Sequence, residues 1–176
     1  MSVPVQVHDR RHSADRRRSE PHPITEDLAA ALADDAVQIL FQPQYRSDDT
    51  QLAGAEALAR WEHPEHGELA GDAVVAIAQS GGIARRFARH IARAAMTAAA
   101  QWPADLRLSL NVTALDLFDR TFGEDLLAML DETGFPAQRL TLEITEQALV
   151  ADLDRSARRL GRLADCGIRI ALDDFG

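Results

Sequence analysis

The sequence predicts an α/β fold in which a parallel sheet is covered by helices. Short apolar runs typical of strands alternate with helical patterns along the chain. Its 176 residues, 46% apolar and 27% charged, match the size and composition of one globular domain. In the runs at 106–113, 140–145 and 168–173, apolar residues alternate with polar ones, so each strand has one face for helices and one polar face. Strands that alternate with helices in this way favour a parallel sheet.

The elements follow an N-terminal tail. Residues 1–22 are arginine-rich and have almost no apolar side chains after Val7, which predicts a disordered tail before a domain at 23–176. A helix is expected at 25–35 with Thr25 as its N-cap, followed by strands at 39–45 and 52–61. Another helix is expected at 124–133, ending at a glycine. Two further helices are predicted from apolar residues every three or four positions: Ile83, Phe87, Ile91, Ala94 and Ala98, then Leu149, Leu153, Ala157, Leu160 and Leu163.

Composition and charge narrow the classes of function. The net charge of −9 argues against a surface that binds DNA or RNA. All 19 basic residues are arginine, so the chain cannot supply a titrating ammonium group. No stretch has the roughly 20 apolar residues that a membrane span needs. A lone cysteine, Cys166, fits a reducing cytoplasm and is expected in the core, whereas His63 and His66 are expected on a surface loop.

Polar side chains with oxygen ligands lie near the carboxyl ends of several predicted strands. Asn111, Glu143 and Asp173 occupy the polar faces of three strands, and Glu56 joins them if its own strand faces the same way. In a sheet curled into a barrel, these side chains would meet at the C-terminal mouth, where barrel enzymes have their active sites. The pattern therefore predicts a functional site at this end of the sheet.

The ligand types favour a hard divalent cation. Carboxylates with one amide, without histidine or cysteine, suit Mg²⁺ or Mn²⁺ and not zinc. Asp173 and Asp174 are consecutive, so their side chains point to opposite sides of a strand and each could reach a different ion. Such a pair is compatible with a two-metal site that activates water and holds a phosphoryl group.

Five segments, in order and with matching spacing, carry a family signature: Phe41-Gln42-Pro43, Glu56-Ala57-Leu58 with Arg60-Trp61, Asn111-Val112-Thr113, Glu143-Ile144-Thr145-Glu146 and Asp173-Asp174-Phe175-Gly176. From about residue 39 to 176, the chain resembles the EAL domain of bacterial cyclic di-GMP phosphodiesterases. One three-letter motif is weak, but five in the right order make the resemblance specific.

The resemblance implies a modified (β/α) TIM-type barrel with one antiparallel strand. It also implies hydrolysis of cyclic di-GMP to linear pGpG with two Mg²⁺ or Mn²⁺ ions. By motif position, Glu56, Asn111, Glu143 and Asp173 would ligate the first metal and Asp174 the second. Glu56, Asp173 and Asp174 would then be the catalytic residues.

The resemblance further implies contacts to the substrate. By motif position, Gln42, Leu58 and Arg60 would contact the dinucleotide, and Glu146 would support the loop after the Asp-Asp-Phe-Gly segment. Gln44 departs from the family pattern, which has an aliphatic residue there, and we expect its side chain to face outward.

The family continues past its Asp-Asp-Phe-Gly segment with a catalytic lysine and further ligands, and the present chain contains none of these. We therefore expect an incomplete barrel whose last strand has an open edge, which favours pairing with a second subunit. Three interpretations follow. The chain is the N-terminal part of a phosphodiesterase domain and is inactive alone, or it is a non-catalytic module that binds cyclic di-GMP or a protein, or it is a non-functional remnant.

Overall fold

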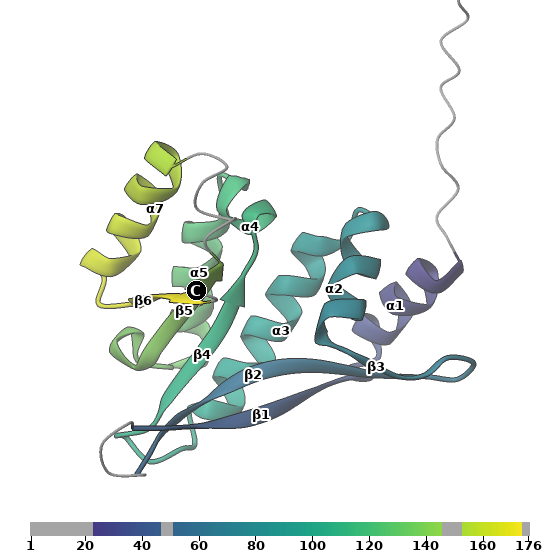
Figure 1. Cartoon of the computed structure of the whole chain (residues 1–176), viewed down its shortest axis with the longest axis horizontal. Coiled ribbons are helices and arrows are strands. Elements are labelled where there is room, and N and C mark those ends of the chain that lie inside the picture. The colour runs from purple at the N-terminus through teal and green to yellow at the C-terminus, as the bar shows by residue number, and fades with distance from the viewer. Residues whose placement is uncertain (1–22, 47–50, 146–152, 174–176) are drawn as a thin grey trace, which may run out of the picture.

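The computed structural model describes residues 23–46, 51–145 and 153–173 (Figure 1). One six-stranded sheet has the order β1-β2-β4-β5-β6, with β3 paired to β2. Parallel ladders join β2 to β4, β4 to β5 and β5 to β6, whereas β1 and β3 run antiparallel to β2. The strands are β1 (Val37–Tyr45), β2 (Leu52–His63), β3 (Gly67–Ala70), β4 (Arg107–Val112), β5 (Leu140–Thr145) and β6 (Arg169–Asp173).

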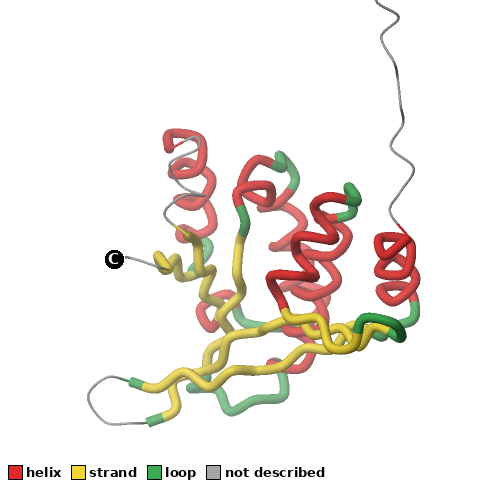
Figure 2. Tube along the Cα trace, turned by 45° about the vertical axis from the view of Figure 1, so that its right-hand side comes forward, coloured by secondary structure: helices red, strands yellow, loops and turns green. Residues whose placement is uncertain are grey.

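The helices lie on one side of this sheet. They are α1 (Pro23–Ala33), α2 (Gly71–Ser80), α3 (Ala84–Ala99), α4 (Ala114–Phe118), α5 (Phe122–Thr133) and α7 (Leu153–Asp165), with a 3₁₀ turn at Ala137–Arg139. Figure 1 shows α1 and α2 above the long ribbon formed by β1 and β2, and α3 running down behind this ribbon; Figure 2 shows the helices and the ribbon from a second side. Within the described part of the chain the sheet does not close on itself. The predicted α/β fold with an incomplete barrel is confirmed.

Two apolar clusters join the helices to the sheet. The larger one packs β4 and β5 against α3, α5 and α7, and Leu108, Leu142 and Ile144 in it are completely buried. The second lies under the far end of β2, where Trp61 meets α1 and α2. Full burial of such a leucine or isoleucine side chain contributes about 1.5–3 kcal/mol. These clusters hold the strand ends that carry the polar residues.

A set of ion pairs connects α3 to α5. Arg85 and Arg89 each contact one oxygen of Asp125, at 2.8 and 3.1 Å. One turn further along α3, Arg93 lies 2.9 Å from Glu132. The three arginines recur every four residues and so lie on one face of the helix. Because the arginines are about half exposed, each pair is worth about 0–1 kcal/mol.

Some of the predicted helical details are wrong. The first helix begins at Pro23, and Thr25 lies in its first turn as a buried residue and not as the N-cap. Proline is favoured at a first helical position, because its missing N–H has no helical partner to lose. In α3 the chain buries Ala95 and Ala99, whereas Ala98 is exposed. A helix so rich in alanine offers several equally apolar stripes, so spacing alone does not select the buried one.

His63 was expected at the surface, but it is a core residue that closes the turn between β2 and β3. Its side chain is 4% exposed and packs edge-on against Trp61. Nδ1 accepts hydrogen bonds from the backbone N–H groups of Glu65 and His66, at 3.0 and 3.2 Å. Nε2 lies 3.3 Å from a carboxylate oxygen of Asp27 on α1. Burial of this imidazole is thus compensated by hydrogen bonds. The cysteine after α7, expected in the core, is exposed.

Candidate functional site

The strand register places several polar side chains on the sheet face opposite the helices. Gln42 of β1 is paired with Glu56 of β2, which is paired in turn with Ser109 of β4. One step nearer the strand ends, Asn111 of β4 is paired with Glu143 of β5. Because side chains at paired positions point to the same face, these residues form two adjacent rows. The C-terminal ends of β4 and β5 carry the second row.

Glu56 and Asn111 are in direct contact. The Asn111 amide donates through Nδ2 to Oε1 of Glu56 at 2.6 Å. Glu56 is half-buried, and Asn111 is exposed at the end of its strand. An asparagine that donates through nitrogen still has a carbonyl oxygen with free lone pairs. The contact therefore orients a carboxylate and leaves an amide oxygen available as a ligand.

Glu143 is held by a second contact, which corrects the prediction for Gln44. Gln44 does not face outward: its Nε2 donates to Oε1 of Glu143 at 2.8 Å. Its own carbonyl oxygen accepts from the buried Ser109 hydroxyl at 3.0 Å. The physical reason is strand alternation, since positions 42 and 44 of one strand share a face.

A capping box positions the end of β4. The Thr113 hydroxyl accepts from the Asp116 backbone N–H, and the Asp116 carboxylate accepts from the Thr113 backbone N–H at 2.9 Å. This reciprocal pair ends the strand and starts α4 directly after Asn111. Burial raises the pKa of the Asp116 carboxyl above its ordinary value, an effect that the hydrogen bonds from Thr113 oppose.

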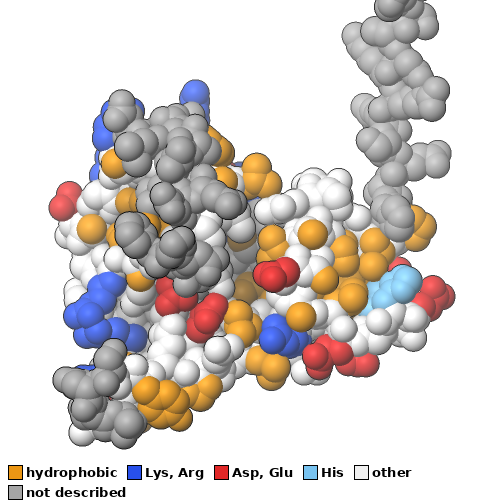
Figure 3. Space-filling view, viewed as in Figure 1, with side chains coloured by type: hydrophobic (Ala, Val, Ile, Leu, Met, Phe, Trp, Pro, Cys, Tyr) orange, Lys and Arg blue, Asp and Glu red, His pale blue; other side chains and the backbone are white. Residues whose placement is uncertain are grey.

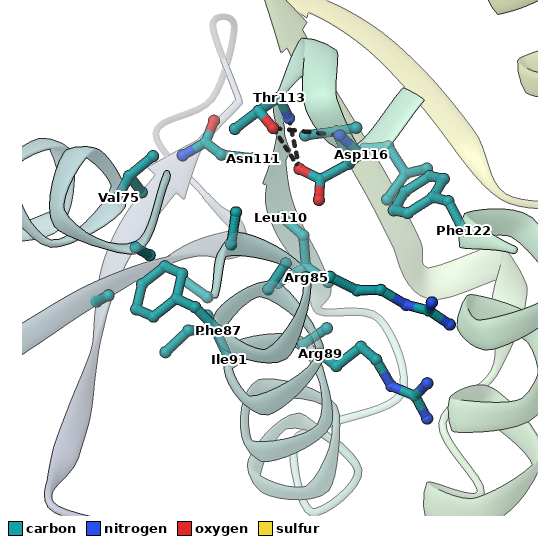
Figure 4. A pocket seen from close by; sticks show the side chains of 18 of the residues that line it. Val75, Arg85, Phe87, Arg89, Ile91, Leu110, Asn111, Thr113, Asp116 and Phe122 are labelled. Carbon is teal, nitrogen blue, oxygen red and sulfur yellow. Dashed lines mark hydrogen bonds between the residues drawn. The ribbon is translucent and has the colours of Figure 1, made fainter. Parts of the chain in front are cut away.

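A cavity of about 640 Å³ adjoins the rows of polar side chains. Glu56, Asn111 and Glu143 line one part of it. Much of the remainder is lined by α2, α3 and α5, through apolar side chains such as Phe87 and charged ones such as Arg85 and Asp125. Figure 4 shows Asn111 and Thr113 at the polar part, with Phe87 on the apolar wall. This volume lies in the range of sites for small molecules, about 300–1,000 Å³.

The predicted substrate residues come from β1 and β2. Gln42 is exposed on the same face as Glu56, and Leu58 is half-buried and lines the cavity. Arg60 is half-buried, and its Nη1 donates to the neighbouring carbonyl of Ala59 at 2.8 Å. A guanidinium has five N–H donors, so this bond leaves others for a ligand.

The remaining predicted ligands lie at the limit of the described residues. Asp173 is the final residue of β6, where its backbone is paired with Thr145 of β5. The Asp173 side chain, and the whole of Asp174 and Glu146, lie outside the described part of the chain.

The donors that the structure brings together fit a hard cation in type. Glu56, Asn111 and Glu143 offer two carboxylates and one amide from adjacent strands, all oxygen ligands of the kind that Mg²⁺ and Mn²⁺ prefer. Among the residues described, no three side chains of histidine, cysteine, aspartate or glutamate converge. The described residues thus supply a portion of such a ligand set.

A largely parallel sheet with carboxylates on its polar face, preceded by an antiparallel strand, makes this an α/β protein with its polar site towards the carboxyl ends of the strands. The family model for the EAL domain matches residues 25–176, and the chain belongs to this family. A Caulobacter vibrioides relative, named an uncharacterized signaling protein, is 35% identical over 153 residues, which cover 87% of this chain and 19% of the relative. A cyclic di-GMP phosphodiesterase of Pseudomonas aeruginosa is 30% identical over 166 residues, with coverages of 92% and 28%.

Solved structures share this fold. The PaMucR phosphodiesterase in complex with c-di-GMP superposes with a TM-score of 0.80 and 27% identity, over 86% of this chain and 63% of that one. The FimX EAL domain from Pseudomonas aeruginosa, bound to c-di-GMP, has a TM-score of 0.77 at 22% identity, over 88% and 63%. The chain thus spans less than two thirds of these relatives. In the part that the structure describes, no helix is long and apolar enough to cross a membrane.

Proposed function

We propose that residues 23–176 form part of a cyclic di-GMP phosphodiesterase domain that uses Mg²⁺ or Mn²⁺. The observation that carries this proposal is the contact of Glu56 with Asn111 beside Glu143, on the sheet face opposite the described helices. The family assignment and the named phosphodiesterases among the relatives support the substrate class.

Each proposed metal ligand has a role that follows from its position in the sheet. Glu56, Asn111 and Glu143 would hold the cation, joined by Asp173, with Asp174 at a second ion. When bound, such a cation lowers the pKa of water and withdraws charge from a phosphoryl oxygen. Asn111 orients Glu56 through its 2.6 Å hydrogen bond, so this ligand is in place before the ion arrives.

Binding of the dinucleotide is assigned to the first two strands. Gln42 and Arg60 supply hydrogen-bond donors and Leu58 an apolar contact, all beside the cavity or on the same sheet face. The excess of negative charge disfavours DNA and RNA as alternative ligands. Cyclic di-GMP is a soluble nucleotide, and we place the protein in the cytoplasm with it.

A second subunit is proposed at β6. Of the described strands only β5 is paired with β6, and Leu172 on this strand is 46% exposed. An unpaired strand edge favours addition of another strand. We expect a dimer, and light scattering at increasing protein concentration tests it; a monomer at all concentrations would contradict this part of the proposal.

The test of function is calorimetric titration of the chain with cyclic di-GMP in the presence of Mn²⁺, together with chromatographic detection of pGpG. We expect binding that falls at least about tenfold in Glu56→Gln, because loss of a ligand should cost no less than loss of a residue that only orients one. The matched control is Glu62→Gln, because Glu62 is an exposed glutamate on the same strand.

The outcomes separate the interpretations. Formation of pGpG by the chain supports a phosphodiesterase that works without further residues. Binding without pGpG favours a module that binds the dinucleotide or needs more of the domain for hydrolysis. Absence of binding, or equal loss in both glutamate variants, would contradict the proposal.

A further inference from the structure

Gln44 is a residue that the function above does not use, although it contacts a proposed metal ligand. Its amide joins two strands that are distant in sequence: Nε2 donates to Glu143 at 2.8 Å, and Oε1 accepts from Ser109 at 3.0 Å. Both ends of the amide are therefore engaged. Ser109 is 2% exposed, so its hydroxyl is a fixed part of the interior.

We propose that Gln44 is a positioning residue, which holds the Glu143 carboxylate in the orientation needed to ligate a divalent cation beside Asn111. This inference rests on the proposed function, since it concerns the same site. The inference adds Gln44 to the residues of the site. The resemblance described above implies an aliphatic residue at this position.

The geometry supports this role in two steps. The Ser109 hydroxyl fixes the plane of the Gln44 amide, because it donates to the amide oxygen and leaves Nε2 turned towards Glu143. The carboxylate then uses one oxygen for Gln44. A carboxylate has about four lone-pair positions, so the second oxygen stays available on the face that it shares with Asn111.

Removal of the Gln44 amide would cost the free energy of a charge-assisted hydrogen bond to Glu143 in a half-buried site. Partners that orient metal ligands typically change metal affinity by about 10–100-fold when they are removed. Gln44 supplies such a partner, because its amide is a fixed donor to Glu143. The expected consequence is tighter cation binding than an aliphatic residue would permit.

The experiment is Mn²⁺ titration of the 176-residue chain, followed by electron paramagnetic resonance and by thermal melting. Gln44→Met keeps the length of the side chain and removes the donor. The control is Gln38→Met, because Gln38 is an exposed glutamine of the same strand. Ser109→Ala is a second variant that frees the Gln44 amide without removing it.

We expect Gln44→Met to weaken Mn²⁺ binding about 10-fold or more and to change the line shape of the bound ion. Ser109→Ala should weaken binding less, and Gln38→Met should not weaken it. Tight binding by Gln44→Met would overturn the positioning role and leave the proposed function intact. If Gln44→Met does not fold, unchanged binding by Ser109→Ala overturns it. Absence of Mn²⁺ binding by the unchanged chain would overturn the metal-dependent function and this inference together.

Discussion

The side-chain amide of Asn111 lies 2.6 Å from Oε1 of Glu56 and donates a hydrogen bond to it, joining the end of β4 to the middle of β2. The two residues are 55 positions apart in the sequence. An amide is suited to this place because it donates to the carboxylate without adding charge. A carboxylate at position 111 would instead bring two negative charges together.

The Asn111→Asp variant should therefore be less stable than the unchanged chain when no metal is present, and a bound cation should restore its stability. Loss of the hydrogen bond costs about 1 kcal/mol, and repulsion adds to this at a partly exposed site. In a chain of this length each 1 kcal/mol lowers the melting temperature by about 2–4 °C. Mn²⁺ should raise the melting temperature of Asn111→Asp more than that of Asn111→Ala, which adds no charge. Equal shifts in both variants would contradict a cation site between these side chains.

We expect the pairing of β2 with β4 to require glycine at position 54. A Cβ atom there would lie 2.3 Å from the backbone oxygen of Arg107, a separation that only movement of a strand can relieve. We expect Gly54→Ala to lower the free energy of unfolding by about 1–3 kcal/mol, as for overpacking of a core. Denaturation by urea measures this loss.

The matched control for that change is Gly161→Ala. Gly161 lies in α7 with open space around the position of a Cβ atom. Alanine is favoured over glycine in a helix interior by about 0.5–1 kcal/mol. The control should therefore be more stable than the unchanged chain. Equal stabilities of the two alanine variants would show that the close approach at Gly54 is not tight in solution.

Much of the sheet could be predicted because its signals are local. The strand at 140–145 matches the prediction at both ends, since its alternation of apolar and polar residues is complete. Gly134, predicted to end a helix, has a φ of 67°, the left-handed conformation that glycine adopts easily. In contrast, β3 and α4 have only four and five residues, too few for a periodic pattern.

The contacts within the site depend on more than local signals. Strand parity alone places Glu56, Asn111 and Glu143 on polar faces. The bond from Gln44 to Glu143 could not be predicted in this way, because it depends on the register of strands 99 positions apart. The inward direction of Gln44 did have a signal, since Gln42 on the same strand was expected to face the site.

Asp116 should make stability depend on pH. Burial raises its pKa above the ordinary value of 3.8, so the folded state favours the protonated form. The contribution of this group is thus fully present below pH 3.8 and is lost as the pH rises through the folded pKa. Asp116→Asn keeps an oxygen acceptor for Thr113 and does not titrate. The stability of the unchanged chain relative to Asp116→Asn should therefore fall as the pH rises.

Asp119 provides a control, because its pKa is shifted in the opposite direction and its effect on stability should depend on pH with the opposite sign. A hydrogen bond from the backbone N–H of Thr121, at 2.9 Å, lowers the pKa of Asp119. Its contribution is present above the unfolded pKa and is lost as the pH falls through the folded one. Urea denaturation of Asp116→Asn and Asp119→Asn from below pH 3.8 to about pH 7 should give opposite slopes. Slopes of the same sign would contradict the assigned environments.

The Thr25 hydroxyl should be a source of instability. Its Oγ1 is buried in the first turn of α1 with no hydrogen-bond partner among the described residues, packed against Gly81 of the turn after α2. Thr25→Val replaces the hydroxyl by a methyl group of similar shape. Because an unsatisfied buried hydroxyl costs about 1–3 kcal/mol, we expect a gain in the free energy of unfolding of about 1 kcal/mol.

Thr97→Val separates this effect from a general preference for valine. Thr97 is exposed on α3, and its hydroxyl donates to the backbone oxygen of Arg93 at 2.8 Å. That variant loses a satisfied hydrogen bond at the surface and should change stability by no more than about 0.5 kcal/mol. Urea denaturation of both variants gives the comparison. A stability gain in Thr25→Val alone supports an unpaired hydroxyl, whereas a loss there would mean that Oγ1 has a hydrogen-bond partner in solution.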